Sequence, residues 1–290
     1  MRLTSLPILA SAAILAGALV SCSGRKDADP QAQALYDGAS EAFQARDYSR
    51  ATLLLDSLQK TFPSELGLQR EAMALRPKVI EQATLLKIST NDSLVATDRL
   101  CLEKLRPEMM WVKNPRMIEG YWVSKSAYNP DFMNTTGLQG RVSEIGEFYI
   151  VSSMNPSSLH HTAVSLSDGA SSVRTPDVAY DGESNYRISG SEVITFSPAQ
   201  SDTIGKFAYS HADIPLTLTF HGKSSKSVKL TRAQVKALSD AYAYSRATIE
   251  ARDLEVQRRH LEATLQVARN QIARTSSDVS DTDAPSSEAQ

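Results

Sequence analysis

Two long segments with helical spacing of apolar residues, 65–105 and 231–274, enclose a segment with a different pattern. They contain 41 and 44 residues, so each could extend about 60–65 Å as a continuous helix. Each carries a single apolar stripe, and a long helix with an unpaired stripe is not stable alone in water. We therefore predict an antiparallel helical stalk that the chain leaves at Pro107 and rejoins at Thr231.

This arrangement predicts which apolar side chains meet. Near the inserted segment, Val235, Leu238 and Tyr242 should face Leu100, Leu102 or Leu105. At the other end, Leu261 and Leu265 should approach Leu75, Val79 or Leu86. In the competing arrangement the C-terminal helices of two copies pair, and we favour the monomer.

Three features of the N-terminal helical segment add to this prediction. Pro77 removes a backbone donor and should kink or break the helix near Leu75 or Arg76. The run 89–93 is a second weak point. Cys101 falls on the apolar face and is expected to be a small buried hydrophobe.

The inserted segment, 108–230, has short alternating runs and frequent turn residues, which are typical of strands. The clearest strands are 121–123, 138–145, 147–152, 162–166, 193–196 and 215–220. Residues 141–145 and 148–151 flank Gly146 as a hairpin would. About eight strands fit an antiparallel β-sandwich or a barrel-like domain, and both remain open. The fold class is therefore α+β.

The N-terminus has the pattern of an export signal. Arg2 is followed by an apolar stretch from Leu3 to Val20, which favours a signal peptide over a membrane span. The end of this stretch and the two residues after it, Leu19-Val20-Ser21-Cys22, resemble the lipobox of bacterial lipoproteins. The resemblance implies cleavage before Cys22 and lipidation of its thiol. Two or more acyl chains hold a protein stably on a membrane, so the implied partner is the membrane itself.

The residues after Cys22 bear on location within the cell envelope. Ser23 stands where enteric lipoproteins kept in the inner membrane carry Asp, so we expect an outer-membrane lipoprotein, on its periplasmic or surface face. The run 23–29 also resembles the charged export signal of surface lipoproteins in Bacteroides-like bacteria. A plain solvated tether explains the same residues equally well.

These patterns divide the chain into six parts. They are a signal peptide (1–21), a tether (22–31), a helical region (32–107), a β domain (108–230), a long C-terminal helix (231–274) and a disordered acidic tail (275–290). With Cys22 lipidated, Cys101 is the one cysteine left, so the fold must depend on a hydrophobic core and no internal disulfide forms.

Residues 35–63 resemble one tetratricopeptide repeat unit. The matching positions are Leu35, Ala39, Tyr48, Ala51 and Pro63, with the turn at residues 46–48. Leu58 departs from the small residue of the motif, and Pro77 falls inside what would be the next repeat. The resemblance implies one helical hairpin, packed on something else, and no chemistry.

Charge and motif content exclude several function classes. The 33 acidic and 31 basic residues are interspersed, so a nucleic-acid partner is disfavoured. No cofactor is indicated. A metal site is disfavoured because adjacent His160 and His161 would point to opposite faces of an extended segment, leaving at most one to join His211 or Asp213. The five histidines are expected to be solvated loop residues.

Aromatic residues cluster where helix meets sheet. Trp111, Tyr121, Trp122 and Tyr128 could form a binding platform for sugar or peptide, although packing is the more common role of such residues.

No catalytic residue is predicted. Two functions follow: a lipid-anchored, non-catalytic scaffold or binding module for an envelope protein or polymer, or an envelope enzyme that uses acidic and histidine residues of the β domain on glycan or peptide.

Overall fold

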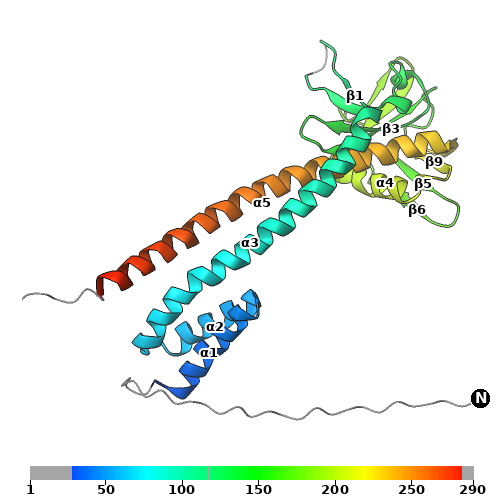
Figure 1. The fold of residues 1–290 in the computed structure, drawn as a ribbon. Helices are drawn as coiled ribbons and strands as arrows, with labels where there is room; N and C mark the ends of the chain where they lie inside the picture. Colours follow the sequence, from blue (N-terminus) through cyan, green and yellow to red (C-terminus); the bar gives the residue numbers. More distant parts are fainter. Residues whose placement is uncertain (1–27, 116–117, 283–290) are drawn as a thin grey trace, which may run out of the picture. The chain divides into compact units, whose positions relative to one another are not determined.

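The computed structural model describes residues 28–115 and 118–282. The predicted signal peptide, Cys22 and residues 283–290 lie outside the described residues. The chain forms two compact units, one made of residues up to Ile80 together with those from Ile272 onward, the other of Glu81–Gln271. Helices and antiparallel sheets are both present, which confirms the predicted α+β class (Figure 1).

The smaller unit contains the predicted helical hairpin, α1 (Pro30–Gln44) and α2 (Tyr48–Thr61). Asp29 caps α1 by accepting a hydrogen bond from the Gln31 N–H at 2.8 Å. Asp47 caps α2 in the same way, with the Arg50 N–H at 3.0 Å. Aspartate at these positions satisfies backbone donors that a helix start leaves without partners, which sets where both helices begin.

The core of this unit is built mostly from alanine and leucine. The buried side chains are Ala32, Ala39, Ala42, Ala51, Leu55, Leu58, Leu68, Ala72, Leu75 and Val79. The last four come from the start of α3 (Leu66–Leu105), so the hairpin packs on a third helix. Gln69 joins the elements by donating to the carbonyls of Leu58 and Phe62, at 3.1 and 2.8 Å.

Helix α3 continues through both predicted weak points. Of the kink or break expected near Leu75 or Arg76, the break is not found: the helix continues past Pro77, and Leu75 and Val79 on either side of it are buried in the same core. In the run 89–93, the hydroxyls of Thr90 and Ser93 donate to carbonyls one turn back, at 3.1 and 3.0 Å. Because such bonds alone do not strengthen a helix, tertiary packing is what outweighs the local preference for a turn, and Asn91 of this run is bonded to the Leu254 carbonyl.

The larger unit has two antiparallel sheets. The first has six strands in the order β1 (Met109–Val112), β2 (Tyr121–Ser124), β3 (Gly137–Ser143), β4 (Phe148–Met154), β8 (Ser191–Thr195) and β7 (Asn185–Ile188). The second has four, in the order β10 (Ser225–Leu230), β9 (Leu216–His221), β5 (Ala163–Ser167) and β6 (Ser172–Arg174). Short 3-10 helices are η1 (Arg106–Glu108), η2 (Lys125–Ala127) and η3 (Phe132–Asn134).

Both sheets contribute to one hydrophobic core. Ile150 and Ile194 of the first sheet and Leu166 and Phe220 of the second are fully buried in the same cluster. Two separate sheets around one core fit the sandwich alternative better than the barrel. The predicted hairpin at Gly146 is confirmed: β3 and β4 pair antiparallel and the glycine has a φ of 93°, a left-handed conformation that favours glycine.

Helix α4 (Pro198–Ser210) was not predicted. Ser197 and Gln200 form a capping box at its start, with Pro198 in the first turn. A capping box is also present at the start of the C-terminal helix: the Thr231 N–H donates to Gln234 Oε1 at 2.8 Å, and the Gln234 N–H donates to Thr231 Oγ1 at 3.3 Å. That helix, α5 (Arg232–Thr282), continues past its expected end at Arg274.

Within the larger unit, α3 and α5 lie side by side and antiparallel (Figure 1). Arg269 Nε donates to Glu81 Oε1 at 3.0 Å near one end, and Arg258 pairs with Asp92 further along. Next to the second pair, Asn91 Nδ2 donates to the Leu254 carbonyl at 3.1 Å. The predicted pairing of the two long helices is therefore correct over this unit.

The predicted side-chain contacts are correct only in part. Leu102 and Leu105 pack against the core cluster that holds Val235 and Leu238, as expected. Leu100 and Leu86 are instead 59% and 60% exposed. Leu75 and Val79 are buried in the core of the smaller unit, among side chains of α1 and α2. Among the described helices, none is long and apolar enough to span a bilayer.

Candidate functional site

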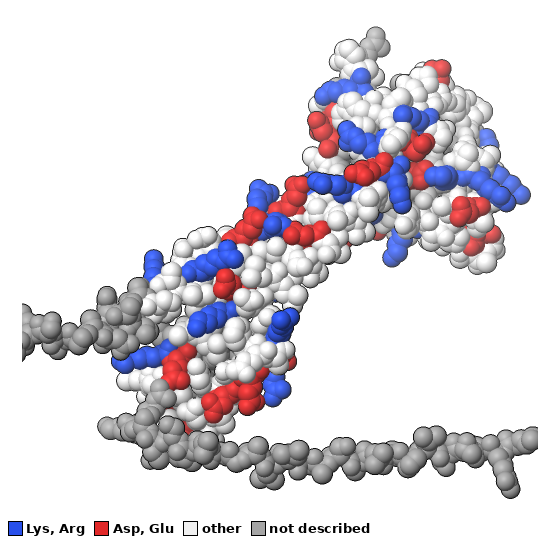
Figure 2. All heavy atoms as spheres, viewed as in Figure 1, with Lys and Arg blue, Asp and Glu red and all other residues white. Residues whose placement is uncertain are grey.

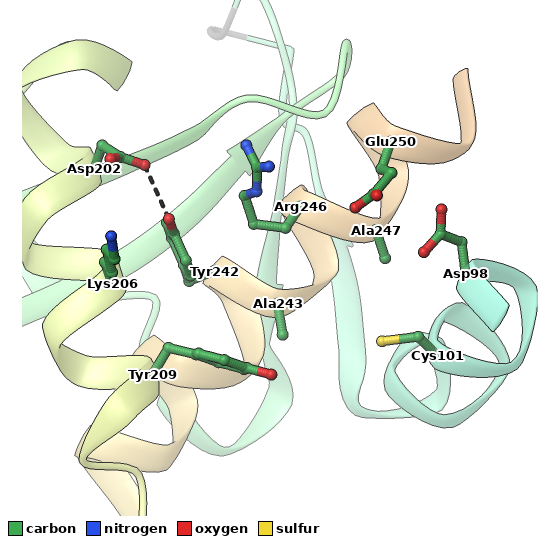
Figure 3. A pocket seen from close by; sticks show the side chains of 10 residues that line it. All are labelled: Asp98, Cys101, Asp202, Lys206, Tyr209, Tyr242, Ala243, Arg246, Ala247 and Glu250. Atoms are coloured by element: carbon green, nitrogen blue, oxygen red, sulfur yellow. Dashed lines mark hydrogen bonds between the residues drawn. The ribbon is translucent and has the colours of Figure 1, made fainter. Parts of the chain in front are cut away.

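A pocket of about 570 Å³ lies between α3, α4 and α5 in the larger unit (Figure 3). Its lining residues are Asp98 and Cys101 from α3, Asp202, Lys206 and Tyr209 from α4, and Tyr242, Ala243, Arg246, Ala247 and Glu250 from α5. We call it the three-helix pocket. Its volume is within the range of small-molecule sites.

The pocket exists because α5 presents small side chains between its neighbours. Ala243 and Ala247 are one helical turn apart and lie on the side of α5 that faces the opening, with α4 on one side and α3 on the other (Figure 3). A larger residue at either position would fill the space. The two alanines are thus the sequence feature that opens this pocket.

Tyr242 and Asp202 join α5 to α4 at one side of the pocket. The Tyr242 hydroxyl donates to Asp202 Oδ1 at 3.0 Å. Burial raises the pKa of Tyr242, and the hydrogen bond to Asp202 raises it further. The Tyr242 ring also contacts the edge of Phe148, with centroids 5.3 Å apart. These contacts hold the ring in place as a fixed wall.

Acidic groups gather at the opposite side. Figure 3 shows the carboxylates of Asp98 and Glu250 on that side of the pocket, across from Asp202. Burial raises the pKa of Asp98, and the nearby charge of Glu250 raises it further. Asp98 Oδ2 is shielded from water and accepts no hydrogen bond from any described residue. Such a group is favourable only if a donor or cation satisfies it.

Two cations, Lys206 and Arg246, border the same pocket. In the part of the chain that the structure describes, neither has a carboxylate within 4.0 Å. Tyr209 beside them is 57% exposed, which is high for an aromatic residue at a helix junction. Figure 2 shows that acidic and basic residues are intermixed on the face drawn there. The three-helix pocket therefore combines unpaired charges of both signs with an exposed aromatic ring.

A second hollow, of about 720 Å³, continues from the three-helix pocket along α5. It shares Arg246 and Glu250 with the pocket and reaches Leu261 and Thr264. Cys101 of the pocket is a free thiol whose pKa is raised, first by burial and then by Asp98. A raised pKa keeps the thiol protonated, which argues against a nucleophilic role.

The predicted aromatic platform does not form as one surface. Trp111 and Trp122 contact each other at 5.3 Å between centroids, and Trp122 also contacts Tyr244 at 5.8 Å. Tyr121 is buried elsewhere, with the Arg141 guanidinium 4.1 Å from its ring centroid. Tyr128 lines a separate hollow of about 300 Å³. Adjacent residues of a strand point to opposite faces, so Tyr121 and Trp122 had to separate.

The histidines form pairs in different places rather than one cleft. His211 Nε2 lies 3.2 Å from Asp168, and His221 Nε2 lies 2.8 Å from Ser165 Oγ. His161 is the exception to the expected solvation, since its side chain is 0% exposed. His161 stands just before the start of β5 and packs against Phe220, with the two ring centroids 5.3 Å apart. The described residues hold no group of three or more His, Cys, Asp or Glu that could bind a metal ion.

His161 is part of a buried chain of hydrogen bonds. Its Nδ1 lies 3.0 Å from Glu192 Oε2, and its Nε2 lies 2.9 Å from Ser152 Oγ. The order serine, histidine, carboxylate resembles a hydrolytic triad, but the Ser152 side chain is fully buried. These hydrogen-bonded side chains lack the access to solvent that a substrate would require, so we assign them a structural role.

The residues of the three-helix pocket were not identified from the sequence. The capping box at Ser197 and Gln200 indicates a helix start in the sequence, so α4, which forms one side of the pocket, could have been predicted. Comparison with protein-family models, with curated proteins and with solved structures found no match.

Proposed function

We propose that this chain is a lipid-anchored, non-catalytic binding module of the bacterial cell envelope, with the three-helix pocket as its contact site for a partner protein or polymer. The observation that carries the binding role is the open pocket itself, with its unpaired charges and exposed Tyr209. The lipobox-like residues 19–22 support the anchoring role. A monomer is proposed because α3 and α5 pair within one chain.

The non-catalytic character is supported by the chemistry of the pocket. A covalent mechanism needs a nucleophile beside a base that activates it. The pKa of the Cys101 thiol and the pKa of the Tyr242 hydroxyl are both raised, first by burial, so both groups stay protonated and neither is activated as a nucleophile. The alternative of an envelope enzyme has support only from the Ser152–His161–Glu192 chain, which is buried.

Anchoring is tested by Cys22→Ala in the full-length chain, expressed in a bacterium that lipidates proteins. We expect this variant to leave the detergent phase in a phase-partition assay, because it cannot be acylated. Cys101→Ala is the matched control and should partition as the natural chain does. If the Cys22 variant stays in the detergent phase, the anchoring proposal is wrong.

Binding is tested with a photo-crosslinking aromatic residue in place of Tyr209, which borders the pocket and is 57% exposed, in the anchored chain. Tyr180, which is 61% exposed and lies outside the pocket, is the control position. We expect a discrete crosslinked product from position 209 and none from 180. Equal crosslinking from both positions, or none from either, would contradict a binding role for the pocket.

A further inference from the structure

We infer that the three-helix pocket recognises a small zwitterion, that is, an ammonium and a carboxylate close together, as in an amino acid or a dipeptide with free ends. The inference goes beyond the proposed function: it keeps the three-helix pocket as the binding site and assigns to it a small ligand in place of a protein or polymer. It is argued from the division of charge across the pocket, from the spacing of the two charged sides and from the groups still lacking a partner.

The carboxylate would bind beside Arg246 and Lys206, on the side where the one carboxylate of the lining, Asp202, already accepts the Tyr242 hydroxyl (Figure 3). Arg246 and Lys206 border the pocket, and neither has a carboxylate within 4.0 Å among the described residues. Both could have been neutralised locally, since Glu250 is one turn after Arg246 and Asp202 is one turn before Lys206. A guanidinium forms paired hydrogen bonds with a carboxylate, which makes Arg246 the primary contact.

The ammonium would bind at the acidic side. Asp98 and Glu250 come from different helices and lie close enough for the charge of one to act on the other. Glu250 lines the pocket, and neither its carboxylate nor that of Asp98 has a cation within 4.0 Å among the described residues, so the negative charge on this side is not neutralised by the protein. An ammonium placed between the two carboxylates supplies three donors and a positive charge, and it removes their repulsion.

The spacing of the two sides sets the size of the ligand. Arg246 and Glu250 are four positions apart on α5, which corresponds to about 6 Å along the helix. The two ends of an extended dipeptide are separated by about 7 Å. A dipeptide therefore matches the spacing of the two positions from which these side chains start. The exposed ring of Tyr209 and the small side chains of Ala243 and Ala247 leave room for its side chains.

The test uses the full-length protein in detergent and four probes: Ala-Ala, its N-acetyl form, its C-terminal amide, and the form blocked at both ends. Binding is measured by ligand-observed NMR titration. We expect Ala-Ala to bind most tightly and each single block to weaken binding about tenfold or more, since each removes one charge-assisted contact. The doubly blocked probe should bind weakest.

Two variants assign the contacts. Arg246→Gln should remove the preference for a free carboxylate, and Glu250→Gln the preference for a free ammonium. Arg259→Gln and Glu255→Gln, which change the same residue types on the same helix outside the pocket, should leave all four affinities unchanged. Far-UV circular dichroism checks that each variant keeps its fold.

Equal affinity for all four probes, or no binding of Ala-Ala at millimolar concentration, would overturn the inference. So would equal losses in the pocket variants and the control variants. Crosslinking from position 209 in the anchored chain is independent of these results. If it succeeds while Ala-Ala fails, the pocket binds a different chemistry and only the ligand class is wrong.

Discussion

Glu192 accepts hydrogen bonds from both the backbone N–H and the Nδ1–H of His161, at 2.7 and 3.0 Å. A carboxylate can only accept, so the proton of the neutral imidazole resides on Nδ1, and Nε2 accepts from the Ser152 hydroxyl. Glu192 also accepts from Ser157 Oγ and from the His160 N–H. One carboxylate thus organises the segment between β4 and β5.

We predict that Glu192→Gln destabilises the protein by about 3 kcal/mol, because it leaves buried donors without an anionic acceptor. Urea unfolding followed by circular dichroism measures the change. Glu183→Gln, in an exposed loop, is the matched control and should shift the unfolding midpoint little. Equal midpoints for the two variants would show that the buried network contributes no stability.

Acid should unfold the protein through the same pair. Burial opposes ionisation of Glu192, but hydrogen bonds from the His161 side chain and backbone and from the His160 backbone outweigh it, and the pKa of Glu192 falls to about 2. Its stabilisation is complete above its ordinary pKa of 4.5 and is lost as pH falls from there toward 2. Burial also lowers the pKa of His161 below 6.5, so protonation of the unfolded imidazole favours unfolding below that pH.

The expected outcome is a urea midpoint that falls between pH 7 and pH 5 through His161, and falls further below pH 4.5 through Glu192. In Glu192→Gln the second decrease should be much reduced. A midpoint that does not change between pH 7 and pH 3 would contradict both assignments.

Gly205 of α4 should tolerate no side chain. A Cβ built there would lie 2.3 Å from Tyr242 Cδ2 and 2.6 Å from Phe148 Cε1. Gly205→Ala is therefore expected to cost about 1–3 kcal/mol and to displace Tyr242 from the pocket wall. Gly67→Ala has open space and should stabilise α3 by up to about 1 kcal/mol. Thermal unfolding compares the two, and a neutral Gly205 variant would show that α4 can move away from α5.

Asn91 of α3 is 2% exposed, and its Oδ1 has no partner among the described residues, although Nδ2 donates to Leu254 and Gln257. Buried polar residues between paired helices fix their register at a cost in stability. We expect Asn91→Leu to raise the free energy of unfolding by about 1 kcal/mol, and Asn91→Ala, which leaves a cavity, to lower it. Lower stability in both variants would mean that the two hydrogen bonds outweigh the unpaired oxygen.

The long helices and main strands could be predicted because their patterns are local. The seam of α3 and α5 followed from two stripes of similar length, and β9 followed from the alternation of Leu216, Leu218 and Phe220 with threonines. Strand β10 was missed because it is a polar edge strand with the pattern Ser-Lys-Ser-Val-Lys-Leu. Strand β10 depends on pairing with β9, and nothing in the sequence of β10 itself indicates that pairing.

The three-helix pocket could not be predicted for a different reason. Asp98, Asp202 and Arg246 come from three separate helices, and no single stretch of sequence contains the site. The buried role of His161 depended likewise on Glu192 and Ser152, which lie on other strands. Each of these sites is defined by tertiary contacts, to which local patterns contribute no information.

The pairing of Asn91 with Leu254 also has a consequence for biogenesis. The two residues are 163 positions apart, so ribosomes adding 5–20 residues per second need on the order of ten seconds to supply the partner of α3. Until α5 is supplied, the apolar stripe of α3 has no partner helix, so a truncation before α5 should leave that stripe uncovered and the product prone to aggregation.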